Sequence, residues 1–137
     1  IIATHSNARA AMTGDAARNQ RHLRDEHIRE IAARDGIIGL NLYGRFLSTG
    51  ERACIDDCLR HLDHLETIAG SRKHLALGSD MDGGFPPTSL PVDLDHPRKL
   101  SGLAEALRTR GWSDEELEGF TCGNWQRLLE RTLPRTG

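Results

Sequence analysis

Two carboxylates, Asp80 and Asp82, follow a short apolar run and precede the glycine pair Gly83 and Gly84. The run begins at His74 and reads His-Leu-Ala-Leu-Gly-Ser, and an apolar run of this length beside turn formers is typical of a buried strand. Parallel sheets place their chemistry at the carboxyl ends of the strands. A carboxylate there can act as a general base, so Asp80 is the candidate catalytic residue. Aspartate and glycine also form ordinary turns, which is the alternative interpretation.

Three further residues have side chains that suit a site at the strand ends, namely His5, Arg18 and Tyr43. His5 ends a short β-branched run and is either a metal ligand or an ordinary loop histidine. Arg18 could clamp a carboxylate through its planar guanidinium, although most loop arginines are simply solvated. Tyr43 either lines a pocket or packs beside the strand ends. His5, Tyr43 and Asp80 are spaced 38 and 37 residues apart, so they occupy similar points of successive units.

The spacing Cys54-x3-Cys58-x2-His61-x2-His64 resembles a zinc-binding pattern. On a single helix these side chains cannot all converge on one tetrahedral centre, and both cysteines lie on the apolar stripe. Core cysteines are therefore the better interpretation. The chain has three cysteines, an odd number that does not form a disulfide framework, which makes a reduced, intracellular setting the default.

Hydrophobic periodicity predicts strands that alternate with helices. The strands are expected at residues 1–4, 37–43 and 75–79. The helices are expected at residues 25–36, 51–69, 97–111, 113–120 and 124–133. Asp25 is the predicted N-cap of the first helix, and Gly36 and Gly70 are the predicted stops of the first and second. Ser113 with Glu116 forms a capping box.

Alternation of strands and helices indicates a parallel α/β sheet. Eight units of about 37 residues would give about 300 residues, which suits a (β/α)₈ TIM-type barrel. An open doubly wound sheet fits the spacing equally well. Three parallel strands cannot close a barrel and would leave open edges. We therefore expect residues 1–137 to be the C-terminal portion of one larger domain whose first strands are absent.

The 137 residues carry 18 Lys and Arg against 20 Asp and Glu, so nothing suggests binding to nucleic acid or to an anionic membrane surface. No apolar run approaches the length of a membrane span. The sequence starts without Met and inside an expected strand, so a signal peptide could precede it. The compartment is therefore unknown, with the cytoplasm as the default.

Several short motifs follow one another along the chain: Thr-His-Ser-Asn-Ala around His5, Arg-Asn at Arg18, Ile-Gly-Leu-Asn-Leu-Tyr ending at Tyr43, and Leu-Gly-Ser-Asp-Met-Asp-Gly around Asp80. His-Leu-Asp-His-Leu with a later Ala-Gly, and a terminal Gly-Asn-Trp-Gln-Arg, complete the series. With these motifs the chain resembles the C-terminal part of the membrane dipeptidase (renal dipeptidase) family of zinc peptidases. The resemblance covers essentially the whole chain, and it favours the catalytic interpretation of Asp80.

The resemblance implies a (β/α)₈ barrel that holds two zinc ions at its C-terminal face and cleaves dipeptides. The chain would supply the last three βα units and the C-terminal helices. His5 resembles the histidine zinc ligand after the sixth strand, Arg18 the arginine that grips the dipeptide's carboxylate, and Asp80 the acid/base aspartate after the eighth strand. Tyr43 is the expected pocket-lining residue. The loop between His5 and Arg18 is slightly longer than in the family's pattern.

The family's other zinc ligands, a His-x-Asp pair, a bridging Glu and a second His, would lie upstream of this chain. Two zinc ions activate a water molecule and polarise the scissile carbonyl, and a single histidine cannot hold zinc in that role. We therefore expect dipeptide hydrolysis only in the full-length protein, with the 137-residue chain inactive by itself.

Two other functions stay open. One is a different amidohydrolase-type metal barrel that acts on another amide or an ester, and the other is a metal-free homologue that only binds ligands or partners. The upstream sequence would discriminate them, because a His-x-Asp pair and the bridging Glu support a hydrolase. The preferred dipeptides and the oligomeric state, a homodimer included, are beyond this sequence.

Overall fold

The computed structural model describes residues 1–134, the side chain of Asp15 excepted. Three short strands form one parallel sheet in the order β1-β2-β3, and they are β1 Ile2–Ala3, β2 Ile37–Leu40 and β3 Leu75–Leu77. The register pairs Ile2 with Ile37 and Ile38 with Leu75. The predicted parallel sheet is confirmed, although each strand is shorter than the apolar run that predicted it.

Backbone hydrogen bonds continue beyond the ends of these strands. Ser6 N donates to Gly39 O at 2.9 Å, and Leu42 N donates to Ser79 O at 3.2 Å. The segments that leave the three strands therefore run side by side at the carboxyl edge of the sheet.

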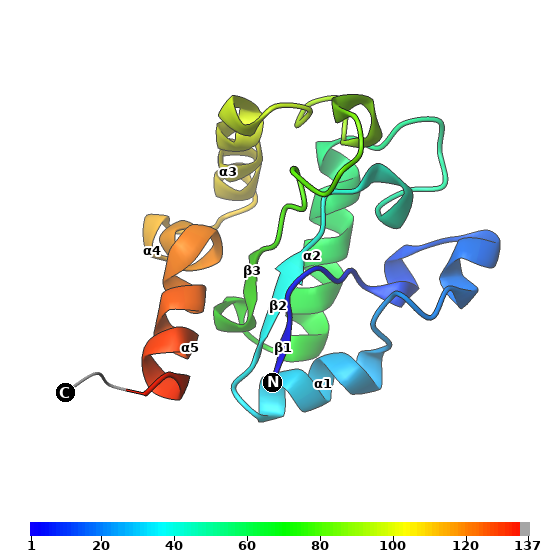
Figure 1. The fold of residues 1–137 in the computed structure, drawn as a ribbon. Helices are drawn as coiled ribbons and strands as arrows, with labels where there is room; N and C mark the ends of the chain where they lie inside the picture. The colour runs from blue at the N-terminus through cyan, green and yellow to red at the C-terminus, as the bar shows by residue number, and fades with distance from the viewer. Residues whose placement is uncertain (135–137) are drawn as a thin grey trace.

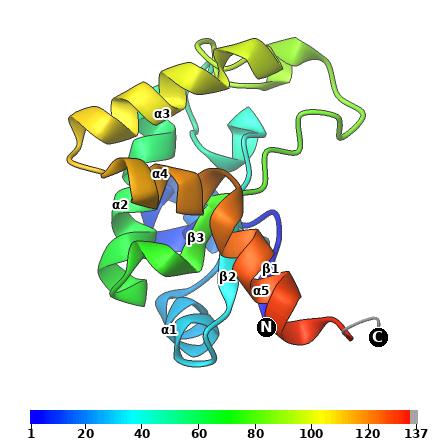
Figure 2. The same ribbon diagram turned by 90° about the vertical axis from the view of Figure 1, so that its left-hand side faces the viewer.

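Five α-helices accompany the sheet in the described part of the chain, namely α1 Asp25–Ala33, α2 Ile55–Ala69, α3 Leu100–Thr109, α4 Asp114–Glu118 and α5 Asn124–Thr132. The π-helical turn Gly119–Gly123 joins α4 to α5. Figures 1 and 2 show α1 and α2 on one side of the strands and α5 on the other. Across residues 1–134, every helix is too short or too polar to cross a membrane.

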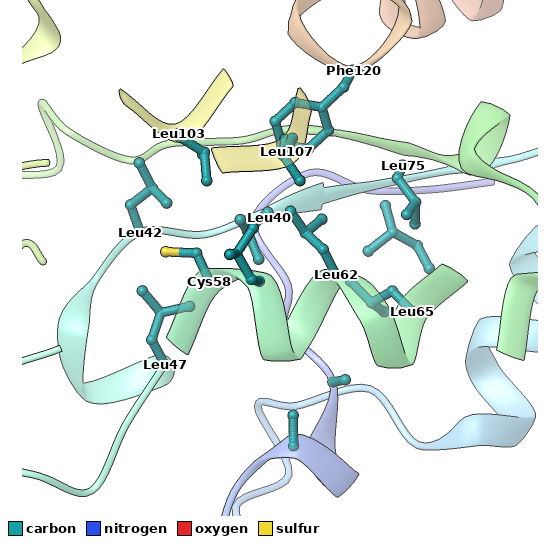
Figure 3. Close-up of a cluster of buried hydrophobic side chains, with 14 of the residues drawn as sticks. Leu40, Leu42, Leu47, Cys58, Leu62, Leu65, Leu75, Leu103, Leu107 and Phe120 are labelled. Atoms are coloured by element: carbon teal, nitrogen blue, oxygen red, sulfur yellow. The ribbon is translucent and has the colours of Figure 1, made fainter. Parts of the chain in front are cut away.

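The larger hydrophobic core lies where the sheet meets α2. Figure 3 shows side chains of the sheet, α2, α3 and the π-helical turn converging there, among them Leu40, Leu62, Leu75, Leu107 and Phe120. Cys58 is fully buried in this core, as predicted, and burial raises the pKa of its thiol. The apolar stripe of α2 thus fixes the helix against the strands whose ends carry the candidate site.

Helix α5 covers the opposite face of the sheet. A smaller core forms there from Ile37, Ala76, Trp125 and Leu128. Trp125 Nε1 donates to Leu77 O at 2.9 Å, and Asn124 Nδ2 donates to Leu75 O at 2.8 Å. Because β3 is an outer strand of this sheet, α5 both covers a face and satisfies carbonyl groups along an edge.

Gly39 and Gly78 allow the chain that leaves β1 to pass directly over the sheet. A Cβ atom on either glycine would collide with Thr4 O. Only glycine permits this approach of one backbone to another. The two glycines thereby bring the segment of His5 against the ends of the neighbouring strands.

The ends of α1 differ from those predicted. Asp25 is the first residue of α1 instead of its N-cap, and its carboxylate lies 2.8 Å from His64 Nε2 in α2. The left-handed residue after α1 is Asp35, with φ 51°, and not Gly36. The Asp35 carboxylate forms an ion pair with Arg127 in α5. The end of α1 is closed locally, since Asp35 N donates to Ala32 O at 2.9 Å and Gly36 N donates to Ile31 O at 2.8 Å.

The ends of the later helices follow local sequence more closely. α2 begins after the N-cap Cys54, whose backbone N donates to Asp57 Oδ2 at 3.0 Å, which is later than predicted. Gly70 ends α2 in the left-handed conformation, with φ 74°, as predicted. The capping box of Ser113 and Glu116 is confirmed at the start of α4.

Candidate functional site

Three polar residues from the three strand ends form one hydrogen-bonded chain. Asn41 Nδ2 donates to Asp80 Oδ2 at 2.9 Å. Asn7 Oδ1 accepts from Asn41 N at 2.9 Å, and Asn7 Nδ2 donates to Asn41 O at 3.0 Å. Asn7 and Asn41 are each only 1% exposed. The carboxyl edge of the sheet therefore carries a hydrogen-bonded polar network that ends at the Asp80 carboxylate.

Asp80 sits in a tight turn directly after β3. Its φ is 58°, in the left-handed region, and Gly83 N donates to Asp80 O at 3.0 Å. A Cβ atom at position 83 would lie 2.5 Å from Asp80 Oδ1. Gly83 therefore lies directly against the carboxylate. Asp82, the competing carboxylate, is exposed.

Tyr43 lies beside this network within a cluster of aromatic rings. Tyr43 N donates to Asn41 Oδ1 at 2.6 Å, which ties the aromatic residue to the network. Its ring centroid lies 4.9 Å from that of Phe46 and 4.7 Å from that of Phe85. Phe85 follows the turn after Asp80, so the aromatic cluster borders the candidate carboxylate on two loops. The pocket-lining role of Tyr43 stays a prediction.

His5 is exposed at the end of β1. Its Nδ1 atom lies 2.8 Å from Thr4 Oγ1, so Nε2 is the ring nitrogen that could bind a ligand. A hydrogen bond to one ring nitrogen is the usual way to orient a histidine whose other nitrogen binds a metal. His5 O accepts from Arg21 Nη2 at 3.1 Å, which joins the His5 segment to the next loop.

Arg18 is the exposed last residue of the 3₁₀ helix Gly14–Arg18, in the loop between β1 and α1. Arg21, three residues further, is the arginine that the sequence analysis missed. Its guanidinium lies 4.7 Å from the centre of the Phe46 ring in addition to its bond with His5 O. The sequence could have indicated Arg21, because it is a second arginine close to the Arg-Asn motif in a loop that is longer than the family's pattern. Asn7 and Asn41 were also missed, although both stand within the quoted motifs.

Two buried histidines lie behind the loop that carries these arginines. His22 is 2% exposed and His61 0% exposed, and their ring centroids are 6.5 Å apart. Burial lowers the pKa of both, that of His61 to about 4, and Arg21 and Arg9 add to the effect on His22. His61 Nε2 donates to Leu47 O at 3.1 Å. Both rings are therefore neutral at pH 7, and they anchor the loop to α2.

The cysteine and histidine residues of the α2 pattern serve in packing and hydrogen bonding. Cys58 and His61 are buried, and His64 pairs with Asp25. No three His, Cys, Asp or Glu side chains within residues 1–134 are placed to hold a metal ion together.

The arrangement defines a class of protein: an α/β protein with a candidate acid/base site at the carboxyl ends of parallel strands, where such sheets place their chemistry. The model of the membrane dipeptidase family, peptidase family M19, matches residues 1–134. The chain belongs to this family.

Individual relatives agree with the family match. An uncharacterized protein in the pqqA 5' region of Klebsiella pneumoniae is 35% identical over 134 residues, which are 95% of this chain and 46% of the relative. Human Dipeptidase 3 is 28% identical over 131 residues, 96% of this chain and 25% of the relative. A metallo peptidase from Rhodobacter sphaeroides, solved with a phosphinate mimic of the dipeptide L-Ala-D-Ala, is 33% identical with a TM-score of 0.80, covering 96% of this chain and 36% of its own. The chain spans less than half the length of each.

Proposed function

We propose that the full-length protein hydrolyses dipeptides with a di-zinc centre and that Asp80 is the acid/base of the reaction. The observation that carries this proposal is Asp80 at the end of β3, bonded to Asn41 at the end of β2, in a chain that matches the dipeptidase family over residues 1–134. The chain would be the last three βα units and the C-terminal helices of a (β/α)₈ barrel. Ile2 in the outer strand β1 is 49% exposed, which suits a further strand beside it.

Asp80 would move the proton in this reaction. An ionised carboxylate beside the scissile bond accepts a proton from the attacking water while the oxygen bonds to the carbonyl carbon. Asp80 then returns the proton to the amide nitrogen as the carbon–nitrogen bond breaks. The products are two amino acids, and Asp80 is ionised again.

His5 would hold one zinc ion through Nε2, with the remaining ligands supplied by the upstream part of the protein. Bound zinc supplies an activated water and polarises the scissile carbonyl. Because a catalytic zinc needs about three protein ligands, the 137-residue chain alone should be inactive.

Recognition of the substrate would use an arginine and the aromatic cluster. A planar guanidinium pairs with a carboxylate through two parallel hydrogen bonds, which suits the free carboxylate of a dipeptide. The family motif assigns this role to Arg18, whereas the contacts at the strand edge favour Arg21. Tyr43, with Phe46 and Phe85, would form the apolar wall that receives a substrate side chain.

The test uses the full-length protein loaded with zinc. We expect it to bind two zinc ions and to cleave free-acid dipeptides in preference to amidated dipeptides and esters. His5→Ala should lose one zinc ion, or bind it much more weakly, with a matching loss of activity, whereas His96→Ala at an exposed position in another loop should not. Hydrolysis of esters or amidated substrates instead would indicate another amidohydrolase, and a protein that binds ligands but no zinc would be a binding homologue.

A further inference from the structure

The two oxygens of the Asp80 carboxylate stand in different surroundings. Oδ2 accepts a hydrogen bond from Asn41 Nδ2 at 2.9 Å. Oδ1 faces Gly83, where an added Cβ would approach it to 2.5 Å. One oxygen is therefore anchored to the neighbouring strand, while the other lies against the backbone of Gly83, where any side chain would collide with it.

The orientation of the Asn41 amide follows from its neighbours. The backbone N–H of Tyr43 can only donate, and it lies 2.6 Å from Asn41 Oδ1, so this atom is the amide oxygen. The NH₂ group must then point to Asp80, where it can only donate. Asp80 Oδ2 is thus fixed as an acceptor from Asn41, and Oδ1 is the oxygen outside this bond.

Asn41 is itself held on every polar atom. Its backbone N–H donates to Asn7 Oδ1, and its backbone carbonyl accepts from Asn7 Nδ2. Asn7 Nδ2 also donates to Phe46 O at 2.9 Å. Because both amides are almost fully buried, the chain that ends at Asp80 has little freedom to rearrange.

We propose that Asn41 is a positioning residue that gives the two oxygens of the Asp80 carboxylate different roles. Oδ2 anchors the carboxylate, and Oδ1 is the oxygen that takes and returns the proton. Asn7 holds Asn41 in this role. The catalytic part of the proposal rests on the proposed function, whereas the positioning of the carboxylate does not.

The test compares two variants of the full-length zinc-loaded protein with a matched control. Asn41→Ala removes the anchor, and Asn41→Asp keeps the acceptor for Tyr43 N but sets a second carboxylate against Asp80. Asn124→Ala removes another buried amide that bonds β3, at the opposite end of the strand, and controls for a loss of buried hydrogen bonds. Crystal structures report the rotamer of Asp80, and steady-state kinetics report kcat and KM.

In both Asn41 variants we expect the Asp80 carboxylate to turn from its wild-type rotamer and kcat to fall by roughly 10–100-fold with KM nearly unchanged. In Asn124→Ala the rotamer and kcat should be those of the wild type. An unchanged Asp80 rotamer in Asn41→Ala overturns the positioning role, even if the protein is not a dipeptidase. If the Asp80 carboxylate turns in the Asn41 variants but their kcat equals that of Asn124→Ala, the separate roles of the two oxygens would be overturned. A wild type that cleaves no dipeptide refutes the proposed function, while the rotamers still decide the positioning role.

Discussion

Asp80 adopts a backbone conformation that few residues other than glycine visit. A φ of 58° costs of order 1 kcal/mol or more for a side chain with a Cβ, and such strain persists only where the surroundings enforce it. The hydrogen bonds from Asn41 and from the backbone of Gly83 provide that enforcement. Strained residues of this kind gather at functional sites, so the conformation of Asp80 supports the role proposed for it.

The two candidate arginines can be ranked by one pair of substitutions in the full-length protein. We expect Arg21→Lys to raise KM for free-acid dipeptides by roughly tenfold, because lysine keeps the charge but loses the forked pair of hydrogen bonds. Arg18→Lys is the matched comparison and should have the smaller effect. The measurement is KM for free and amidated dipeptides. If Arg18→Lys has the larger effect, Arg18 is the residue that binds the substrate carboxylate. Equal cleavage of free and amidated dipeptides by the wild type would refute this role for both arginines.

At this scale the sequence predicted the place of Asp80 but not its surroundings. A short apolar run that ends at Asp and Gly identifies a strand end, which is local information. Asn7 and Asn41 are 34 residues apart, and their mutual hydrogen bonds exist only because β1 and β2 are parallel neighbours. Asparagine is also common in loops, so neither residue stood out before the strands were paired.

Among the elements, α5 helps to hold β3, the strand that leads to Asp80, in place. It bonds the carbonyl groups of Leu75 and Leu77 through side chains and packs Leu128 over Ile37. These contacts satisfy carbonyl groups along the outer edge of β3.

Trp125→Phe tests this contribution of α5. The substitution keeps an aromatic ring but leaves Leu77 O without its hydrogen bond, so we expect a loss of about 1–2 kcal/mol in the free energy of unfolding of the full-length protein. Leu129→Ala, at an exposed position of the same helix, should change the stability by less than about 0.5 kcal/mol. Denaturant unfolding measures both. Equal stability of the two variants would show that α5 does not secure β3 through Trp125.

The elements themselves were largely predictable, because strands and helices leave distinct hydrophobic periods in the sequence. Helix ends set by local chemistry, such as the Ser113 capping box and Gly70, were predicted correctly. The ends of α1 were not: Asp25 pairs with His64 in α2 instead of capping the helix, and Asp35, paired with Arg127 in α5, is left-handed in place of Gly36. Such partners lie far away in the sequence and become neighbours only when the sheet forms.

For the whole molecule, the buried histidines make stability depend on pH. His22 and His61 have pKa values below the ordinary value for histidine, chiefly because burial disfavours the charged ring. Arg9 and Arg21 repel a charge on His22, and Arg60 repels one on His61. Below the ordinary histidine pKa, the unfolded chain therefore binds protons that the folded chain does not.

The free energy of unfolding should fall as the pH falls from about 6.5 to about 4, by about 3 kcal/mol from His61 alone. Above this window the stabilisation is fully present. His61→Gln keeps a donor for Leu47 O but cannot be protonated, so it should flatten this pH dependence. Denaturant unfolding of the full-length protein across the window measures the slope, with His27→Gln at an exposed position as the control. An undiminished slope in His61→Gln would show that His61 is not the source.

We propose that the full-length molecule is a hydrolase and that Asp80 transfers the proton from the attacking water to the leaving nitrogen. Turnover of a dipeptide and zinc content, measured side by side for the wild type, Asp80→Asn and Asp82→Asn, test it most directly. Asp80→Asn keeps the shape of the side chain and removes its basicity, so turnover should fall by roughly 10²–10⁴-fold while both zinc ions stay bound. Asp82→Asn, an exposed neighbour in the same turn, should lose much less. A crippled Asp82→Asn, or an Asp80→Asn that simply loses its metal, would contradict the assignment of Asp80 as the acid/base.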